Sequence, residues 1–186
     1  MKNPVEGFSA GLVDDSDVFQ WQVTIIGPPD TPVREAPPRE PPPPRPVPAA
    51  PAAPPAPAIF TPARNPPQYE GGFFNATMSF PDDYPNKPPS VRFTSEMWHP
   101  NVYKDGRVCI SILHDPGEDP HGYEEAGERW RPVHTVESIL LSIISMMSSP
   151  NDESPANIDA AKMFREEYAD FKKKVARIVR KSQEML

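Results

Sequence analysis

The chain has 186 residues, a formal net charge of −7 and a pI near 5.1. Because phosphate binding requires clustered positive charge, this balance argues against nucleic acid as a partner and favours protein partners. No run approaches the roughly 18 apolar residues that span a bilayer, so we expect no direct membrane insertion.

The chain contains a single cysteine, Cys109. A lone cysteine forms no internal disulfide, and this favours a reducing compartment in which a thiol is kept for chemistry. The start of the sequence has no apolar stretch followed by a small-residue cleavage site, so no secretory signal is indicated. We therefore expect the protein in the cytoplasm or the nucleus.

Residues 18–26 alternate apolar and polar side chains, and the apolar ones are Phe19, Trp21, Val23 and Ile25. This period of two predicts a half-buried β-strand. The next four residues, 27–30, read Gly-Pro-Pro-Asp and are typical of a turn that ends the strand.

A proline-rich tract, residues 32–68, follows this turn and holds 16 of the chain's 29 prolines. Its composition offers few side chains for a core and predicts a disordered or polyproline II segment. We therefore predict a core domain formed by residues 1–31 and 69–186, with residues 32–68 as a disordered insertion. The insertion is expected to be an inert linker or a gene-model artefact, or else a ligand for a polyproline-binding domain.

Beyond the tract, residues 69–72 read Tyr-Glu-Gly-Gly and indicate a turn. A second alternating run then predicts a strand, and its apolar side chains are Phe74, Ala76, Met78 and Phe80. The tract would thus divide a β-hairpin. Prolines interrupt the following loop, after which residues 90–94 predict a third strand. Consecutive strands of this kind indicate an antiparallel meander.

Two helices are predicted in the last third of the chain. The first has apolar residues at positions 136, 139, 140, 143, 144 and 147, which form one wide face, and Thr135 is its predicted N-cap. The second is predicted over residues 158–182, with one apolar stripe that begins at Phe164 and Tyr168. Strands first and helices later indicate an α+β fold class.

Several short motifs follow one another outside the proline-rich tract. They are Gly27-Pro28-Pro29-Asp30-Thr31, Tyr69-Glu70-Gly71-Gly72, Phe80-Pro81-Asp82-Asp83-Tyr84-Pro85, Trp98-His99-Pro100-Asn101, Gly106-Arg107-Val108-Cys109 and Pro150-Asn151. With this combination the chain resembles the ubiquitin-conjugating enzymes over about residues 3–31 and 69–186. The resemblance implies a four-stranded antiparallel meander packed by helices. Relatives complete a first helix before the position of Met1, so that helix is expected to be largely missing.

The resemblance implies that Cys109 accepts ubiquitin from the activating enzyme as a thioester. With a RING-type ubiquitin ligase, the chain would then pass ubiquitin to a lysine of a substrate or of ubiquitin itself. A thiolate suits this task, because it attacks activated acyl groups and the thioester stays reactive toward amines. No cofactor is expected, since the activating enzyme uses the ATP. The alternative is a noncatalytic variant that binds ubiquitin or a ligase, because the first helix is truncated.

Asn101 matches the family residue that stabilises negative charge on the thioester carbonyl during attack. It could instead only bond the backbone of its own turn, as Asn commonly does. Four further residues, His99, Ser154, Asp152 and Tyr103, match positions that support the site. In the family the histidine packs structurally. The serine is expected to shape the loop that receives the lysine, with the aspartate's charge nearby, and the tyrosine belongs to the turn before the cysteine.

Two other types of cysteine site are not favoured. A protease-like pair of Cys109 with His99 lacks a third orienting residue at a diagnostic spacing. A zinc site built from Cys109, His99, His114 and His121 lacks the paired ligand spacing that such sites show. We therefore expect no metal site.

Ligase docking in the family uses two loops, which correspond here to Asn86 and to residues 130–133. Trp130 and Pro132 are the expected contacts in the second loop. Asn86 stands where relatives often carry an apolar anchor, and such anchors contribute most of the binding energy in many interfaces. We therefore expect this residue to weaken or redirect the choice of ligase.

Residues 114–129 resemble the acidic insertion of the subgroup that serves endoplasmic-reticulum-associated degradation. Members of this subgroup build chains on a lysine of ubiquitin, and a partner would bring the protein to the cytosolic face of the endoplasmic reticulum. The acidic residues concerned are Asp115, Glu118, Asp119, Glu124 and Glu125. The insertion is either a solvated surface loop or a segment that shapes the surroundings of the cysteine.

Overall fold

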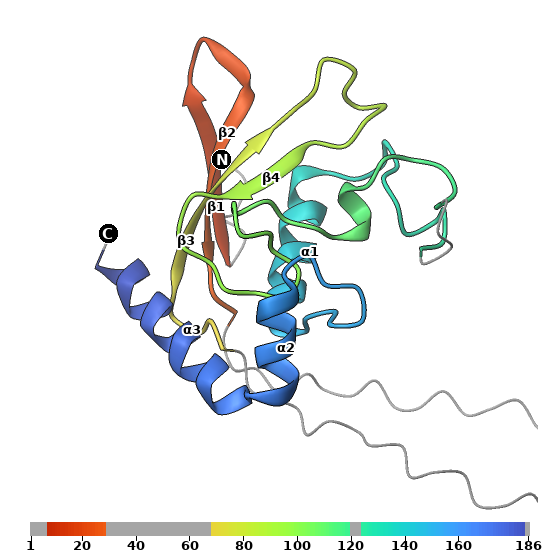
Figure 1. The fold of residues 1–186 in the computed structure, drawn as a ribbon. Helices are drawn as coiled ribbons and strands as arrows, with labels where there is room; N and C mark the ends of the chain where they lie inside the picture. The colour runs from red at the N-terminus through yellow and green to blue at the C-terminus, as the bar shows by residue number, and fades with distance from the viewer. Residues whose placement is uncertain (1–6, 29–67, 120–123, 185–186) are drawn as a thin grey trace, which may run out of the picture. The chain divides into compact units, whose positions relative to one another are not determined.

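The structure is a computed structural model that describes residues 7–28, 68–119 and 124–184. These residues form the predicted α+β fold, with strands first and α-helices later (Figure 1). The elements are β1 Phe8–Asp14, β2 Asp17–Ile26, β3 Phe73–Ser79, β4 Ser90–Phe93, the 3₁₀ helix η1 Ser111–Leu113, α1 Val136–Ser148, α2 Ile158–Glu166 and α3 Tyr168–Gln183.

The four strands form one sheet in the order β1-β2-β3-β4, and each neighbouring pair is antiparallel. This is the predicted meander. The sequence predicted β2, β3 and β4, but not β1. β1 lies at one edge of the sheet, and almost all of it is solvent-exposed. Its sequence therefore carries no strong alternation of apolar and polar residues.

The β2–β3 hairpin closes although the proline-rich tract separates its strands. Ile26 pairs with Phe73, and the Gly27 amide donates to the Gly72 carbonyl oxygen at 2.8 Å. A Cβ at Gly27 would lie 1.6 Å from the Tyr69 carbonyl oxygen, so only glycine allows this close approach. The predicted division of a hairpin is confirmed. Residues 29–67, and with them nearly all of the tract, lie outside the described residues, as do residues 1–6.

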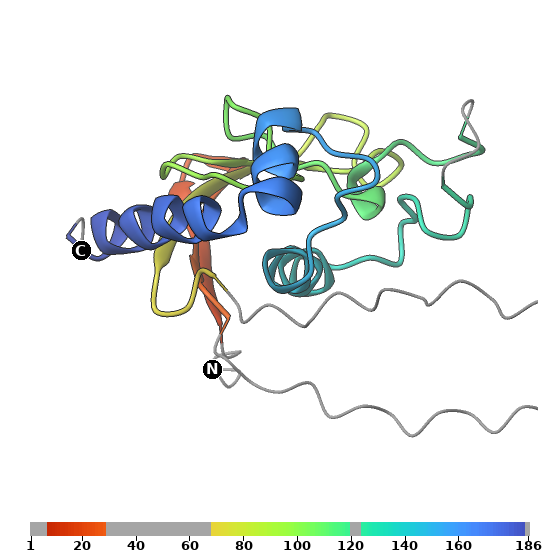
Figure 2. The ribbon, with the colours of Figure 1, turned by 60° about the horizontal axis from the view of Figure 1, so that its bottom comes forward.

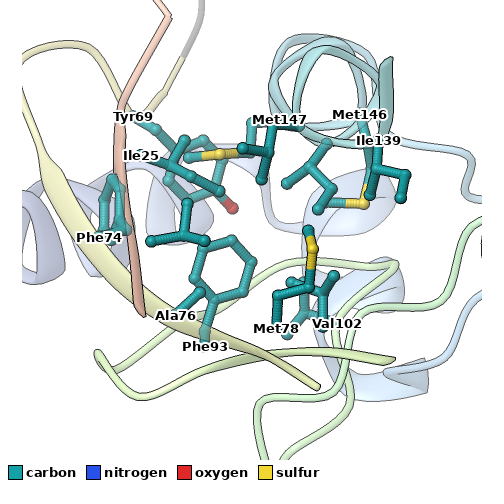
Figure 3. Packing of buried hydrophobic residues seen from close by; sticks show 14 of the residues in the cluster. Ile25, Tyr69, Phe74, Ala76, Met78, Phe93, Val102, Ile139, Met146 and Met147 are labelled. Carbon is teal, nitrogen blue, oxygen red and sulfur yellow. The ribbon is translucent and has the colours of Figure 1, made fainter. Parts of the chain in front are cut away.

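The core is formed by buried side chains of the sheet, of α1 and of α3. Figure 3 shows methionines from α1 pointing toward side chains from β2, β3 and β4. The buried residues that meet there include Ile25, Phe74, Met78, Phe93, Ile139, Met146 and Met147. The inward positions of β3 are those that its alternation predicted, up to Met78. Phe80 lies one residue beyond the end of the strand and is only partly buried.

Helix α1 begins where the sequence predicts. The Thr135 side chain accepts a hydrogen bond from the Ser138 amide, and the Ser138 side chain accepts one from the Thr135 amide. This reciprocal capping box satisfies amide donors that otherwise have no partner at a helix start. The orientation of α1 matters for function, because its serine-bearing side faces the connection that carries Cys109.

The prediction of one helix over residues 158–182 is wrong, because two helices occupy this segment. The chain breaks at Glu167, whose φ of −131° and ψ of 47° are not helical. Figure 1 shows α2 and α3 running in different directions, and Figure 2 shows α1 nearly end-on beside them. The Asn157 amide ties the start of α2 to the Pro100 carbonyl, while Ser182 near the end of α3 accepts from the Phe73 amide. The break at Glu167 allows the start of α2 and the end of α3 to form these two hydrogen bonds.

Candidate active site

Cys109 lies in the long connection between β4 and α1. Its amide donates to the Asn101 carbonyl oxygen at 2.9 Å, which places the two motif residues side by side. The turn that separates them contains Gly106, whose φ is +92°. A Cβ on Gly106 would lie 2.3 Å from the Phe93 carbonyl oxygen, so this glycine fixes how the chain approaches the cysteine.

The Cys109 side chain opens into a cavity of about 240 Å³ and is partly exposed to solvent. Asn101, His114 and Glu124 contribute to the same cavity. Its other wall is polar because α1 contributes serines, among them Ser142 and Ser145. The cavity is therefore reachable from outside and holds several hydrogen-bonding groups beside the sulfur.

Within the described residues, two polar groups lie close to the Cys109 sulfur. Its Sγ lies 3.4 Å from Nε2 of His114, and the Tyr103 hydroxyl donates to it at 3.9 Å. The hydrogen bond with His114 is the main cause that lowers the pKa of the Cys109 thiol, against the opposing effect of burial. A lowered pKa increases the fraction of thiolate, which is the nucleophilic form of cysteine.

His114 is held by a carboxylate on its other side. Its Nδ1 lies 2.8 and 2.9 Å from the two carboxylate oxygens of Glu124. The Ser111 hydroxyl donates to that carboxylate at 2.8 Å, and Arg129 Nε stands 3.7 Å away. The hydrogen bond with Cys109 raises the pKa of His114 to about 9, and Glu124 adds to the rise while burial opposes it. Together these contacts favour a thiolate paired with an imidazolium.

The sequence did not predict this pairing. His114 follows Cys109 by five residues, and the 3₁₀ helix η1 between them turns the imidazole back toward the sulfur. The histidine five residues after the cysteine could therefore have predicted this pairing, provided that a short turn between the two residues was expected. In the part of the chain that the structure describes, no group of three His, Cys, Asp or Glu residues is arranged to hold a metal ion.

Asn101 connects the site to the segment that follows α1. Its Nδ2 donates to the Asn151 carbonyl oxygen at 2.7 Å, and its Oδ1 accepts from the Asn151 amide at 2.8 Å. The side chain thus bonds a distant backbone segment and not its own turn. An amide nitrogen carries two hydrogens, so this contact uses only one of its two N–H groups.

His99 is fully buried and supports the turn that carries Asn101. Its Nδ1 accepts from the Asn101 amide at 2.9 Å. The proton of the neutral ring is therefore assigned to Nε2, which faces the Met146 carbonyl oxygen at 3.1 Å. Burial lowers the pKa of His99 to about 4, so the ring stays neutral at physiological pH. Both nitrogens are engaged by backbone groups, and the ring acts as a packing element.

The other three supporting residues have different surroundings, and only some of them lie at the cysteine. Tyr103 is exposed, and the Arg107 guanidinium lies over its ring, 4.8 Å from the centroid. Ser154 lines the cavity together with the cysteine. The Asp152 carboxylate is 4.0 Å from Arg165 on α2, and its carbonyl oxygen accepts from the same guanidinium at 2.7 Å. Asp152 therefore faces α2 and is not part of the cavity wall.

The two expected ligase loops lie against each other, but their residues differ in exposure. The Trp130 side chain is fully buried, and its Nε1 donates to the Pro85 carbonyl oxygen at 2.8 Å. It therefore offers no surface to a ligase, which corrects the expectation of a direct contact. Asn86 and Pro132 are exposed, and Val133 is 72% exposed. Trp130 instead joins the two loops that present these residues.

Trp130→Ala is expected to lower the free energy of unfolding by about 3–5 kcal/mol, because it empties a fully buried site. Urea unfolding followed by fluorescence or circular dichroism measures this loss. Trp130→Phe keeps most of the apolar volume but loses the hydrogen bond, so it should cost less than the alanine variant. A loss below about 1 kcal/mol for Trp130→Ala would contradict the role assigned to this side chain.

The acidic segment divides into two parts. Asp115, Glu118 and Glu125 are exposed to solvent. Glu124 turns inward to His114, and its amide donates to the Asp119 carboxylate at 3.3 Å. The segment is therefore more than a solvated loop, because one of its carboxylates reaches the surroundings of the cysteine.

The fold and the cysteine site define a class of acyl-transfer protein. The chain belongs to the ubiquitin-conjugating enzyme family, which its sequence matches over residues 58–179. It is 60% identical over 184 residues to "Ubiquitin-conjugating enzyme E2 7" of Arabidopsis thaliana, covering 99% of this chain and 89% of that protein. It is 46% identical over 180 residues to "Ubiquitin-conjugating enzyme E2 G2" of Homo sapiens, covering 97% and 87%.

A solved structure, that of human ubiquitin-conjugating enzyme E2 G1, has a similar fold. Its TM-score is 0.52 at 45% sequence identity, and the match covers 80% of this chain and 85% of that chain. The predicted family, its subgroup with an acidic insertion and the predicted fold are thus confirmed. The protein is a thioester-forming transferase whose family works with ubiquitin, an activating enzyme and a ligase. In the described part of the chain, no helix is long and apolar enough to cross a membrane.

Proposed function

We propose that Cys109 is the residue that carries ubiquitin. Its thiolate attacks the activated carboxyl group that the activating enzyme presents, and a thioester forms. The observation that carries this proposal is the partly exposed sulfur in an open cavity, 3.4 Å from a histidine that favours the thiolate. In the second step an amine attacks the thioester and ubiquitin passes to a lysine.

Asn101 would act in this second step. Attack by the amine places negative charge on the thioester carbonyl oxygen, and a fixed N–H donor stabilises such a charge. The bonds to Asn151 hold the carboxamide in one orientation and leave one N–H for the oxyanion. His99 supports this turn, Ser154 shapes the acceptor side of the cavity, and Tyr103 borders the sulfur.

We also propose which type of ligase the protein binds and which degradation pathway it serves. The exposed residues Asn86, Pro132 and Val133 form a surface for a RING-type ligase, and Val133 supplies apolar area there. Because Asn86 is polar, ligases that need an apolar anchor at this position are expected to bind less tightly. The acidic segment favours a role in endoplasmic-reticulum-associated degradation, with chain formation on a lysine of ubiquitin and location at the cytosolic face through a partner.

A loading reaction tests the proposed function. The purified chain is incubated with activating enzyme, ATP and ubiquitin, and the products are separated with and without reductant. We expect one adduct of a single ubiquitin, which requires ATP and disappears with reductant. Absence of any reductant-sensitive adduct would overturn the proposal and favour a noncatalytic binding protein.

A further inference from the structure

We propose that His114, oriented by Glu124, accepts the proton of the amine that attacks the thioester on Cys109. This inference rests on the proposed function, because it requires a thioester at that sulfur. It makes His114 a catalytic residue of the discharge step and gives one carboxylate of the acidic segment a positioning role.

The contacts of the imidazole define which nitrogen can receive a proton. Nδ1 of His114 meets both carboxylate oxygens of Glu124, so in the neutral ring the proton resides on Nδ1. Nε2 then carries a lone pair directed to the sulfur side, 3.4 Å from Sγ of Cys109. The carboxylate is itself fixed by the Ser111 hydroxyl and faces Arg129. A base held on both sides in this way is pre-oriented toward the reacting atoms.

The imidazole is available as a base only after loading. In the free enzyme the sulfur is the first cause that raises the pKa of His114, so the ring is held as an imidazolium. Thioester formation removes the negative charge from the sulfur, and the pKa of His114 must fall while Glu124 continues to support it. Among the described residues, the other ionisable groups nearby are the Tyr103 hydroxyl beside the sulfur, Arg129, which faces the Glu124 carboxylate, and Asp119, whose carboxylate accepts from the Glu124 amide.

The discharge step then balances without an outside reagent. The amine nitrogen forms a bond to the thioester carbonyl carbon and becomes cationic, and Nε2 of His114 takes the proton that it releases. The C–S bond breaks, and its electron pair returns to Sγ of Cys109. The products are an amide and a thiolate–imidazolium pair, which is the pair that the contacts of the free enzyme favour. Each turnover therefore restores the nucleophile for the next loading.

The test measures single-turnover discharge of the purified thioester to free lysine as a function of pH. Both the neutral amine and the neutral imidazole are needed, so the wild-type log rate should rise with a slope of about 2 at low pH and about 1 above the pKa of His114. His114→Gln should be slower by about 100 to 10,000-fold near neutrality and keep a slope of about 1 throughout. Glu124→Gln should show a smaller loss in rate.

Two further variants separate proton transfer from general damage to the loop. Glu128→Gln alters an exposed carboxylate of the same segment and should retain the wild-type profile. Tyr103→Phe removes the other hydrogen bond to the sulfur. Its discharge rate should still change from a slope of about 2 to a slope of about 1 with rising pH, even if the rate itself differs from that of the wild type. Thermal unfolding of each variant verifies that the fold is intact.

The outcomes distinguish this inference from the proposed function. If the wild-type chain loads on Cys109 but His114→Gln discharges at the same rate with the same change of slope, the inference is overturned and the function stands. If Glu128→Gln lowers the rate as much as Glu124→Gln, the positioning role of Glu124 is overturned. Absence of loading in every chain, wild type included, would instead reject the proposed function.

Discussion

Cys109→Ala is expected to abolish the ubiquitin adduct, and Cys109→Ser is expected to give an adduct that survives reductant. Alanine removes the nucleophilic atom, whereas serine places an oxygen in the same cavity beside His114. A hydroxyl is a much weaker nucleophile than a thiolate, so serine should load slowly. Once formed, its oxygen ester is less reactive toward amines, and we expect it to accumulate.

The measurement compares the three chains in the same loading reaction, with a reductant and with free lysine added afterwards. The wild-type adduct should vanish under both treatments, and the serine adduct should persist under both on the timescale of the wild-type reaction. Substantial loading of Cys109→Ala would contradict the assignment, because no other described cysteine exists to form a thioester.

Asn101→Ala is expected to retain loading while slowing discharge to free lysine by about 100 to 1,000-fold, the usual cost of losing one oxyanion donor. The same substitution breaks both hydrogen bonds to Asn151, so the loop beside the cavity loses its clamp. A single-turnover chase of the purified thioester isolates discharge from loading. Thermal unfolding of the variant shows how much of the effect comes from stability.

A second asparagine, in the sheet and away from the cavity, provides a matched control. Asn75 on β3 also uses its carboxamide, in a hydrogen bond with Thr24, but it does not line the cavity. Asn75→Ala should therefore discharge at close to the wild-type rate. If Asn101→Ala discharged as fast as this control, the oxyanion role of Asn101 would be rejected and only its clamp role would remain.

Sequence periodicity predicted those strands and helices that bury one face and expose the other. In β3 the alternation up to Met78 corresponds to inward and outward faces, and in α1 the wide apolar face is the buried one. Periodicity failed where burial is weak or where one residue changes the direction of the chain. β1 is almost wholly exposed, and the stripe from Phe164 to Phe171 continues across Glu167 although the helix does not.

Only the part of the candidate site that consists of motifs close together in the sequence was predictable. The His-Pro-Asn motif and Cys109 are joined by a backbone hydrogen bond between Asn101 and Cys109 across one turn, so their proximity follows from the sequence. The His114–Glu124 contact depends on how η1 turns and on how the acidic segment folds inward, which spacing alone does not determine. The burial of Trp130 likewise depends on its contact with Pro85, 45 residues away in sequence.

Peptide mapping of the loaded chain tests the central claim most directly. The adduct is digested at low pH without reductant, and the peptides are identified by mass spectrometry. We expect the carboxyl end of ubiquitin to be joined to the peptide that contains Cys109, through a bond that reductant cleaves. Attachment to a lysine peptide, with the Cys109 peptide recovered free, would contradict the assignment of this cysteine as the carrier.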